Sequence, residues 1–306
     1  MLTTGFQTGL HRFAVILAAC TVFLLAAGAS VTSNEAGLAV PDWPLSYGSL
    51  MPPMVGGIFY EHGHRMVATT VGFLTIILAV WLQRREPRAW MRRLGWVALA
   101  GVIVQGILGG ITVRFFLPPA VSISHATLAQ LFFCAVVSVA VFTRRWWHSD
   151  IASLQAASQP PLLGWTLASL AAIFIQLILG AAFRHKVLGI LPHALWAAVV
   201  AYVVFRTAAI ARDHRLEIVP AFRRIARFIH ALLGLQLCLG GAALWARLAT
   251  ADYPQPMPVM VWTTVIHVVF GALVLGSVVV LALCASRVLR PSAGYAVESR
   301  PQGVTA

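Results

Sequence analysis

The hydrophobic and polar positions of this chain are arranged in long blocks, not in residue-by-residue alternation. Eight apolar stretches are each long enough to cross a lipid bilayer as a helix, which takes about 20 residues. They lie near residues 13–32, 65–82, 95–115, 125–143, 163–183, 193–210, 228–246 and 261–285. The first stretch lacks a small-residue cleavage site, and we interpret it as a retained helix. The pattern predicts an all-α integral membrane protein with eight transmembrane helices.

A short signature recurs in every second apolar stretch. It reads Gln-x-x-x-Gly followed by Gly or Ala at residues 105–110, 176–181 and 236–241, and residues 24–29 form a copy without the glutamine. Each following stretch carries a histidine in its first turns. These histidines are His64, His125, His193 and His267. The repetition indicates one helical hairpin used four times.

The composition agrees with a membrane location. Hydrophobic residues make up 59% of the 306 residues and charged residues 10%, against roughly 25% charged residues in soluble domains. The net charge of +13 would suit a nucleic-acid partner, but 17 of the 22 basic residues lie in alternate connections and near the termini. The positive-inside rule therefore places both termini in the cytoplasm. The charge is explained by orientation and contact with lipid headgroups, not by nucleic acid.

The same topology places the four histidines near the outer face, because each begins a stretch that enters the membrane from outside. A polar ring inside a membrane costs free energy, so four imidazoles repeated at one depth indicate a functional role. We interpret the four as two pairs of axial ligands for two iron porphyrins. The glycines at the same level either allow close helix packing or leave room for a flat macrocycle.

The segment before the second apolar stretch carries a polar cluster that the other hairpins lack, Glu61-x-x-His64-Arg65. If a helix has begun there, Glu61 and His64 share one face. The carboxylate of Glu61 would then exchange protons beside a porphyrin ligand, or it would only complement a helix dipole. Arg65 would pair with a haem propionate or extend to the headgroups.

The four cysteines, Cys20, Cys134, Cys238 and Cys284, show no CxxC spacing. This argues against covalent haem attachment, an iron–sulfur cluster and a zinc site. We expect all four to be buried free thiols, which behave as small apolar residues.

These features together resemble the haem A synthase family. The most specific parts are Pro41-Asp42-Trp43-Pro44-Leu45, the Glu61-x-x-His64-Arg65 motif, Leu108-Gly109-Gly110-Ile111-Thr112-Val113 and the spacing of the four histidines. The resemblance implies two pseudo-symmetric four-helix halves, residues 1–150 and 151–306. It implies that the substrate haem O lies between His64 and His125, with Glu61 catalytic. It also implies that haem B is a cofactor held by His193 and His267.

The activity implied by the resemblance is oxidation of a ring methyl of haem O to a formyl group, which gives haem A for terminal oxidases. The implied location is the bacterial inner (cytoplasmic) membrane, with the haem sites toward the periplasmic side. The implied partners are haem O and haem A, haem O synthase as supplier, the lipid bilayer and a membrane electron donor or acceptor. A homo-oligomer is compatible with this interpretation.

The sequence departs from the pattern of this family at one place. Many relatives have two cysteines flanking the Pro-Asp-Trp-Pro-Leu segment, where this chain has Val40 and Ser46, so no disulfide is expected there.

Two other classes of protein are alternatives. The first is a bis-histidine b-type cytochrome that relays electrons without modifying haem, although Glu61 argues against that function. A transporter or assembly factor is the second, but transporters usually carry polar residues at the membrane midplane.

Overall fold

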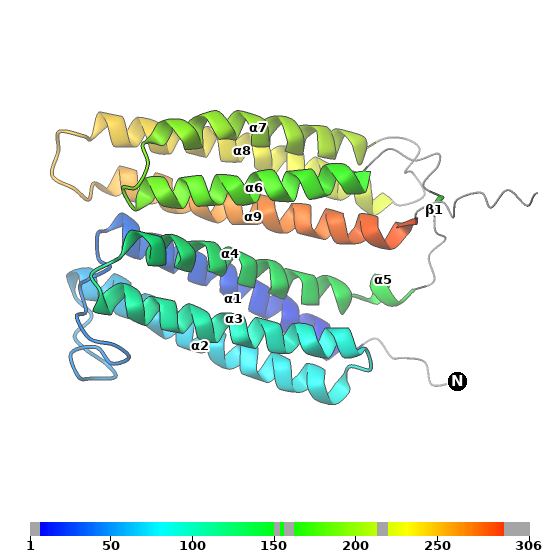
Figure 1. Ribbon diagram of the computed structural model, residues 1–306, viewed down its shortest axis with the longest axis horizontal. Coiled ribbons are helices and arrows are strands. Elements are labelled where there is room, and N and C mark those ends of the chain that lie inside the picture. The colour runs from blue at the N-terminus through cyan, green and yellow to red at the C-terminus, as the bar shows by residue number, and fades with distance from the viewer. Residues whose placement is uncertain (1–6, 150–153, 156–161, 213–219, 291–306) are drawn as a thin grey trace, which may run out of the picture.

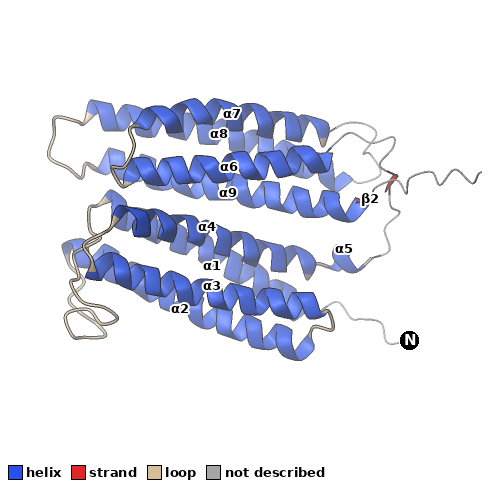
Figure 2. Cartoon of the chain, viewed as in Figure 1, coloured by secondary structure: helices blue, strands red, loops and turns tan. Residues whose placement is uncertain are grey.

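The computed structural model describes residues 7–149, 154–155, 162–212 and 220–290. The helices are α1 (Thr8–Ser33), α2 (Gly56–Arg85), α3 (Ala89–Arg114), α4 (Pro119–Phe142), α5 (Arg145–His148), α6 (Leu162–Arg184), α7 (Ile190–Ile210), α8 (Pro220–Ala249) and α9 (Pro258–Val288). Two-residue strands, β1 (Leu154–Gln155) and β2 (Leu289–Arg290), pair in parallel. Helices make up nearly all of the described chain (Figure 2). The prediction of an all-α chain with eight membrane-spanning helices is confirmed for these residues, since every helix except α5 is long and apolar enough to cross a membrane.

The long helices lie side by side in two groups, α1–α4 and α6–α9 (Figure 1). The groups meet where α1 and α4 contact α9 and where α4 contacts α6. Four connections lie together at one end, which we call the loop end: residues 34–55, 115–118, 185–189 and 250–257. Helix α1 begins at the opposite end. The predicted boundary at residues 150 and 151 lies outside the described residues, and pseudo-symmetry and the cytoplasmic location of the termini stay predictions.

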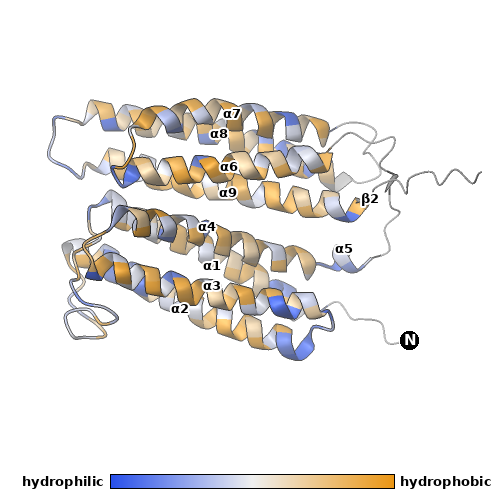
Figure 3. Ribbon diagram, in the orientation of Figure 1, coloured by the Kyte–Doolittle hydropathy of each residue, from blue (hydrophilic) through white to orange (hydrophobic). Residues whose placement is uncertain are grey.

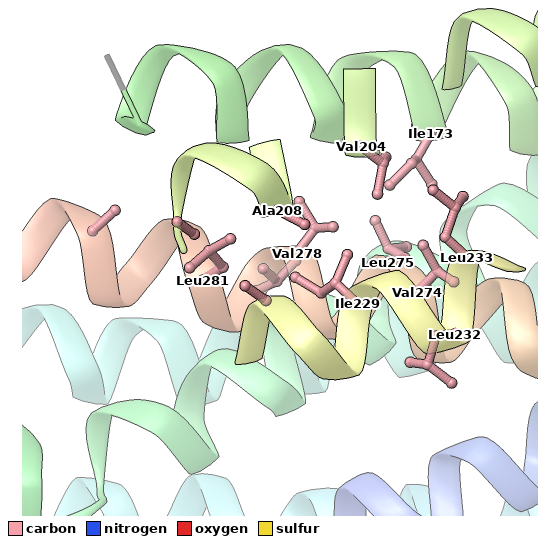
Figure 4. Packing of buried hydrophobic residues seen from close by; sticks show 14 of the residues in the cluster. Ile173, Val204, Ala208, Ile229, Leu232, Leu233, Val274, Leu275, Val278 and Leu281 are labelled. Carbon is pink, nitrogen blue, oxygen red and sulfur yellow. The ribbon is translucent and has the colours of Figure 1, made fainter. Parts of the chain in front are cut away.

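Apolar side chains form the contacts within each group. In the second group, Leu275 and Val278 of α9 meet Ile229 of α8, Val204 of α7 and Ile173 of α6, all buried (Figure 4). The first group has its own core of buried residues, including Leu17, Leu78, Met91 and Val136. These cores hold the helices in place and so fix which side chains meet at the loop end.

The outer surfaces of the helices are apolar as well (Figure 3). Large side chains such as Phe23, Val97 and Leu195 are more than three-fifths exposed, at 62%, 62% and 64%. A helix that is apolar on every side is typical of a membrane span. The chain is a multi-pass membrane protein.

The helices begin earlier than the apolar stretches predicted. The difference is largest for α2, which begins at Gly56, whereas the apolar stretch suggested a start near residue 65. Hydropathy misses these turns because they carry the polar residues Glu61 to Arg65. Glu61 and His64 therefore lie on one helix, as their shared face requires.

Candidate functional site

Each of the four repeated histidines lies against the glycine of the preceding helix, near the loop end. A methyl group built on that glycine would stand close to Cε1 of the ring. The distances are 3.1 Å for Gly28 and His64, 3.5 Å for Gly109 and His125, 2.9 Å for Gly180 and His193, and 3.0 Å for Gly240 and His267. Distances near 3.0 Å are too short for ordinary packing. Gly28, Gly180 and Gly240 therefore allow close packing of an imidazole, whereas the contact at Gly109 is of ordinary length.

The ring nitrogens differ in their surroundings. In all four histidines Nδ1 is buried and has no hydrogen-bond partner in the described part of the chain. At Gly180 and Gly240 the ring places Nδ1 nearer to the glycine, at 3.1 and 3.5 Å, than Nε2, at 3.8 and 3.9 Å. Nε2 of each ring instead lies 3.4 Å from the side-chain amide of a glutamine on the same helix as that glycine, Gln176 for His193 and Gln236 for His267.

The rings of His193 and His267 lie 6.3 Å apart, centre to centre, with their planes at 83°. Two imidazoles on opposite sides of one metal ion, with metal–nitrogen bonds of about 2 Å, have ring centres about 6 Å apart. The two side chains therefore fit one iron between them. The similarity of His64 and His125 to this pair rests on their contacts with Gly28 and Gly109.

The glutamines of the repeated signature contact the histidines. Each precedes its glycine by four residues and so lies one turn away on the same helix face. The amide of Gln105 donates to the His125 carbonyl (2.8 Å), that of Gln176 donates to the His193 carbonyl (3.0 Å), and that of Gln236 lies 3.4 Å from Nε2 of His267. Their recurrence was visible in the sequence, but no role was assigned to them. Leu24 occupies the corresponding place before Gly28, so His64 lacks this support.

Glu61 and Arg65 fasten the connection 34–55 to α2. Oε1 of the buried Glu61 lies 2.6 Å from Nη2 of Arg65, and its Oε2 accepts the Val40 N–H at 2.7 Å. Nη1 of Arg65 donates to the carbonyls of Asp42 and Leu45, both at 2.8 Å. We call these two side chains the loop clamp. Both terminal nitrogens of Arg65 already donate hydrogen bonds within the chain. Binding of a haem propionate by Arg65 stays a prediction, and it would require the propionate to replace some of these acceptors.

Further contacts order the same connection. Ser46 Oγ lies 2.8 Å from Nδ1 of the buried His62. The carboxylate of Asp42 accepts the N–H groups of Tyr47 and Gly48 at 2.6 and 2.8 Å. The Gly48 N–H is the main reason that the pKa of Asp42 lies below its usual range. Hydrogen bonds therefore hold Ser46, one of the two positions at which we expected no disulfide.

Trp43 carries the connection across to α3. A methyl group on Gly110 would stand 2.8 Å from Cδ2 of the Trp43 indole, and Arg114 donates to the Trp43 carbonyl at 3.2 Å. A hollow beside this contact is lined by Trp43, Ile107, Gly110, Ile111, Arg114 and Phe115. The second glycine of this pair thus accommodates an indole from the loop end.

All four cysteines are free thiols. Our expectation that all four are buried was wrong: Cys284 is buried, Cys20 and Cys134 are half-buried, and Cys238 on α8 is exposed. An exposed thiol is compatible with an apolar stretch here, because these helices present apolar side chains outward as well as inward.

The sequence of this chain is similar to those of known proteins. A family model described as cytochrome oxidase assembly protein matches residues 56–192. A heme A synthase of Symbiobacterium thermophilum is 32% identical over 181 residues, 56% of this chain and 58% of that protein. A heme A synthase of Halalkalibacterium halodurans is 30% identical over 191 residues, 58% of this chain and 61% of that protein. The chain is therefore similar in sequence to heme A synthases over more than half of its length.

The family match covers Glu61, His64, Arg65 and His125 and ends one residue before His193. The chain spans less than two thirds of the length of these curated relatives. The similarity is thus concentrated in the half that contains the loop clamp.

Proposed function

We propose that the chain is a haem A synthase, an oxidoreductase that converts the ring methyl of haem O to the formyl group of haem A. The observation that carries this proposal is an asymmetry between two otherwise parallel halves. Both halves place histidines against glycines near the loop end. The loop clamp of Glu61 and Arg65 stands beside His64 in the first half, and the family match includes these residues.

In the second half, His193 and His267 would hold haem B as the cofactor. Their 6.3 Å ring separation supports this assignment. Bound by two histidines, haem B supplies electron transfer and is closed to other ligands. Gln176 and Gln236 steady the two imidazoles, and Gly180 and Gly240 set how far the rings lie from their neighbouring helices.

In the first half, His64 and His125 would hold haem O as the substrate. Glu61 is one helical turn from His64, and its carboxylate is the proton acceptor of this site. The Val40 N–H and the Arg65 guanidinium hold the carboxylate in one orientation. The connection 34–55 is held next to this site by the loop clamp.

The substrate and its route follow from chemistry. Haem O carries a long apolar tail, so it reaches the first half laterally through the bilayer, supplied by haem O synthase. The hollow lined by Trp43, Ile107 and Arg114 lies beside this route. The oxygen atom of the formyl group comes from water or dioxygen. With water as its source, each formyl group formed releases four protons and four electrons, and the electrons pass to a membrane acceptor. We place the sites toward the periplasmic side of the bacterial inner membrane on the basis of the arginine distribution.

The alternative, a b-type cytochrome that only relays electrons, is favoured by the fit of His193 and His267 to one iron. The pigment extracted from purified protein distinguishes the two functions. After expression beside a source of haem O, we expect haem A or a hydroxylated intermediate together with haem B. Haem B alone, with the same pigment from a His64→Ala control, would support the relay.

A further inference from the structure

Arg184, the last residue of α6, reaches across to the first group of helices. Its Nη2 donates to the carbonyl of Ala29 at 3.2 Å and lies 3.0 Å from Oγ of Ser33, both on the last turns of α1. Its Nη1 is buried and has no hydrogen-bond partner in the described part of the chain. One edge of the guanidinium thus joins two helices, and the other is left without an acceptor.

The positive charge of Arg184 also lacks a carboxylate partner. The ion pairs among the described residues join Arg65 to Glu61 and Arg88 to Glu86, and neither includes Arg184. The helix dipole at the end of α1 compensates part of a positive charge. An enclosed Arg N–H without an acceptor nevertheless costs free energy, and a charge in a membrane protein usually has a partner. An anion at Nη1 would meet both requirements.

The position of Arg184 indicates which anion this is. Arg184 follows Gly180 by four residues, so both lie on one face of α6, and Gly180 contacts the ring of His193. Ala29, whose carbonyl Arg184 binds, packs in one cluster with Val265 of α9, two residues before His267. Arg184 therefore lies one turn nearer the loop end than His193, beside the start of α9.

We infer that Nη1 of Arg184 binds a propionate carboxylate of the tetrapyrrole held by His193 and His267. This inference rests on the haem B site proposed above. A guanidinium presents paired N–H groups that match a carboxylate. The contact would also fasten the haem to α1 through Ala29 and Ser33, linking the two groups of helices.

Haem B and its dimethyl ester, which lacks the propionate charges, provide the test. Apo-protein from haem-deficient cells is titrated with each compound in detergent, and binding is followed by the Soret band. We expect the wild-type chain to prefer haem B by roughly ten- to hundredfold, the range for a hydrogen bond to a charged group. Arg184→Gln should bind the two compounds about equally.

Arg247→Gln is the matched control. Arg247 lies near the end of α8 over the ring of Phe183, with 4.9 Å from its Cζ to the ring centre. It therefore tests loss of a positive charge close to Arg184. This variant should keep the preference for haem B. Equal loss in both variants would show a general effect of charge and would overturn the inference.

The other outcomes are also distinct. A preference for haem B that survives in Arg184→Gln would overturn the inference and leave the haem B site intact. A wild-type chain that binds neither compound with a low-spin spectrum would refute the haem B site itself. If Arg184→Gln fails to fold, Arg184→Lys keeps the charge but loses the paired donors, and a preference as large as in the wild type would count against the contact. A lipid phosphate as the true ligand would appear as anionic lipid that co-purifies with the wild type and is lost in Arg184→Gln, with the haem preference unchanged.

Discussion

Gly180 of α6 and His193 of α7 lie so close that a methyl group on the glycine would stand 2.9 Å from Cε1 of the imidazole. The contact recurs, with small differences, in all four helical hairpins. It fixes the depth and the direction of each imidazole from the neighbouring helix. The glycines therefore act on the candidate ligands directly.

Gly180→Ala should displace His193 and weaken haem retention in the second half. Overpacking of this kind costs about 1–3 kcal/mol, which exceeds the gain of about 1 kcal/mol from replacing glycine by alanine in a helix. The bound haem per protein and the low-spin α-band of the purified variant measure the effect. Gly240→Ala, at 3.0 Å from His267, should behave in the same way.

Gly164→Ala is the control on the same helix. Nothing lies within 4 Å of a methyl group at Gly164, so haem content should stay at the wild-type level. Gly109→Ala, at an ordinary 3.5 Å from His125, should also be tolerated. Equal haem loss in all these variants would show that the glycines act through general helix packing.

The two histidine pairs should be unequal in function. His193→Ala and His267→Ala should empty the haem B site and reduce the low-spin spectrum, because each removes an axial ligand. His64→Ala and His125→Ala should abolish conversion of haem O while leaving most of that spectrum. Four variants with the same spectrum and the same residual activity would contradict the division into a substrate half and a cofactor half.

Glu61→Gln should stall the reaction while the protein retains haem B. The amide can still accept the Val40 N–H, but it loses the charge that pairs with Arg65 and the oxygen that accepts a proton. Loss of a general base slows a reaction by about 10²-fold or more. The pigments extracted from the variant should include unconverted or partly oxidised haem O. Normal haem A output would leave Glu61 with a structural role only.

Ser46→Ala separates catalysis from loop order. It removes the contacts of Ser46 Oγ with His62 at 2.8 Å and with Arg65 at 3.4 Å but leaves the Glu61 carboxylate and its ion pair with Arg65 in place. We expect faster proteolysis of the connection 34–55 and only a partial loss of conversion. A loss as large as that in Glu61→Gln would assign the effect of Glu61 to the loop.

Acid should loosen the same connection through Asp42. The pKa of Asp42 is depressed in the folded chain, chiefly by the Gly48 N–H. The stabilisation is therefore complete above the unfolded-state pKa of about 3.9 and is lost as pH falls through the lower folded value. Thiol labelling of a Ser49→Cys variant should accelerate across this range. Adding Asp42→Asn should give fast labelling at neutral pH and remove the acid-dependent step.

Orientation in the membrane can be read from two exposed serines at opposite ends of the molecule, Ser49 in the connection 34–55 and Ser149 after α5. In intact cells, an impermeant thiol reagent should label Ser49→Cys and not Ser149→Cys, above the background of the native cysteines. Labelling at Ser149→Cys alone would invert the topology and place the histidines toward the cytoplasm.

Hydropathy was sufficient to find every membrane-spanning helix, because the bilayer requires long apolar segments whatever their neighbours are. Hydropathy was a poor guide to where α2 begins, because the first turns of this helix contain the charged residues Glu61 and Arg65. The repeated Gln-x-x-x-Gly signature marked glutamines and glycines that contact His125, His193 and His267. The sequence did not show that Gln176 contacts the His193 backbone or that Gly180 receives its ring.

Local rules thus decided the helical class, the number of spans and the depth of the four histidines. Which side chains meet depends on residues far apart in the chain, and only helix packing decided it. Glu61 meets the backbone of Val40, and Arg184 of α6 meets the end of α1, more than 150 residues earlier. Periodicity describes the face and depth of a residue on its own helix but not the helix that packs against it. The sequence therefore did not show that Arg65 binds the connection 34–55 or that Arg184 binds the end of α1.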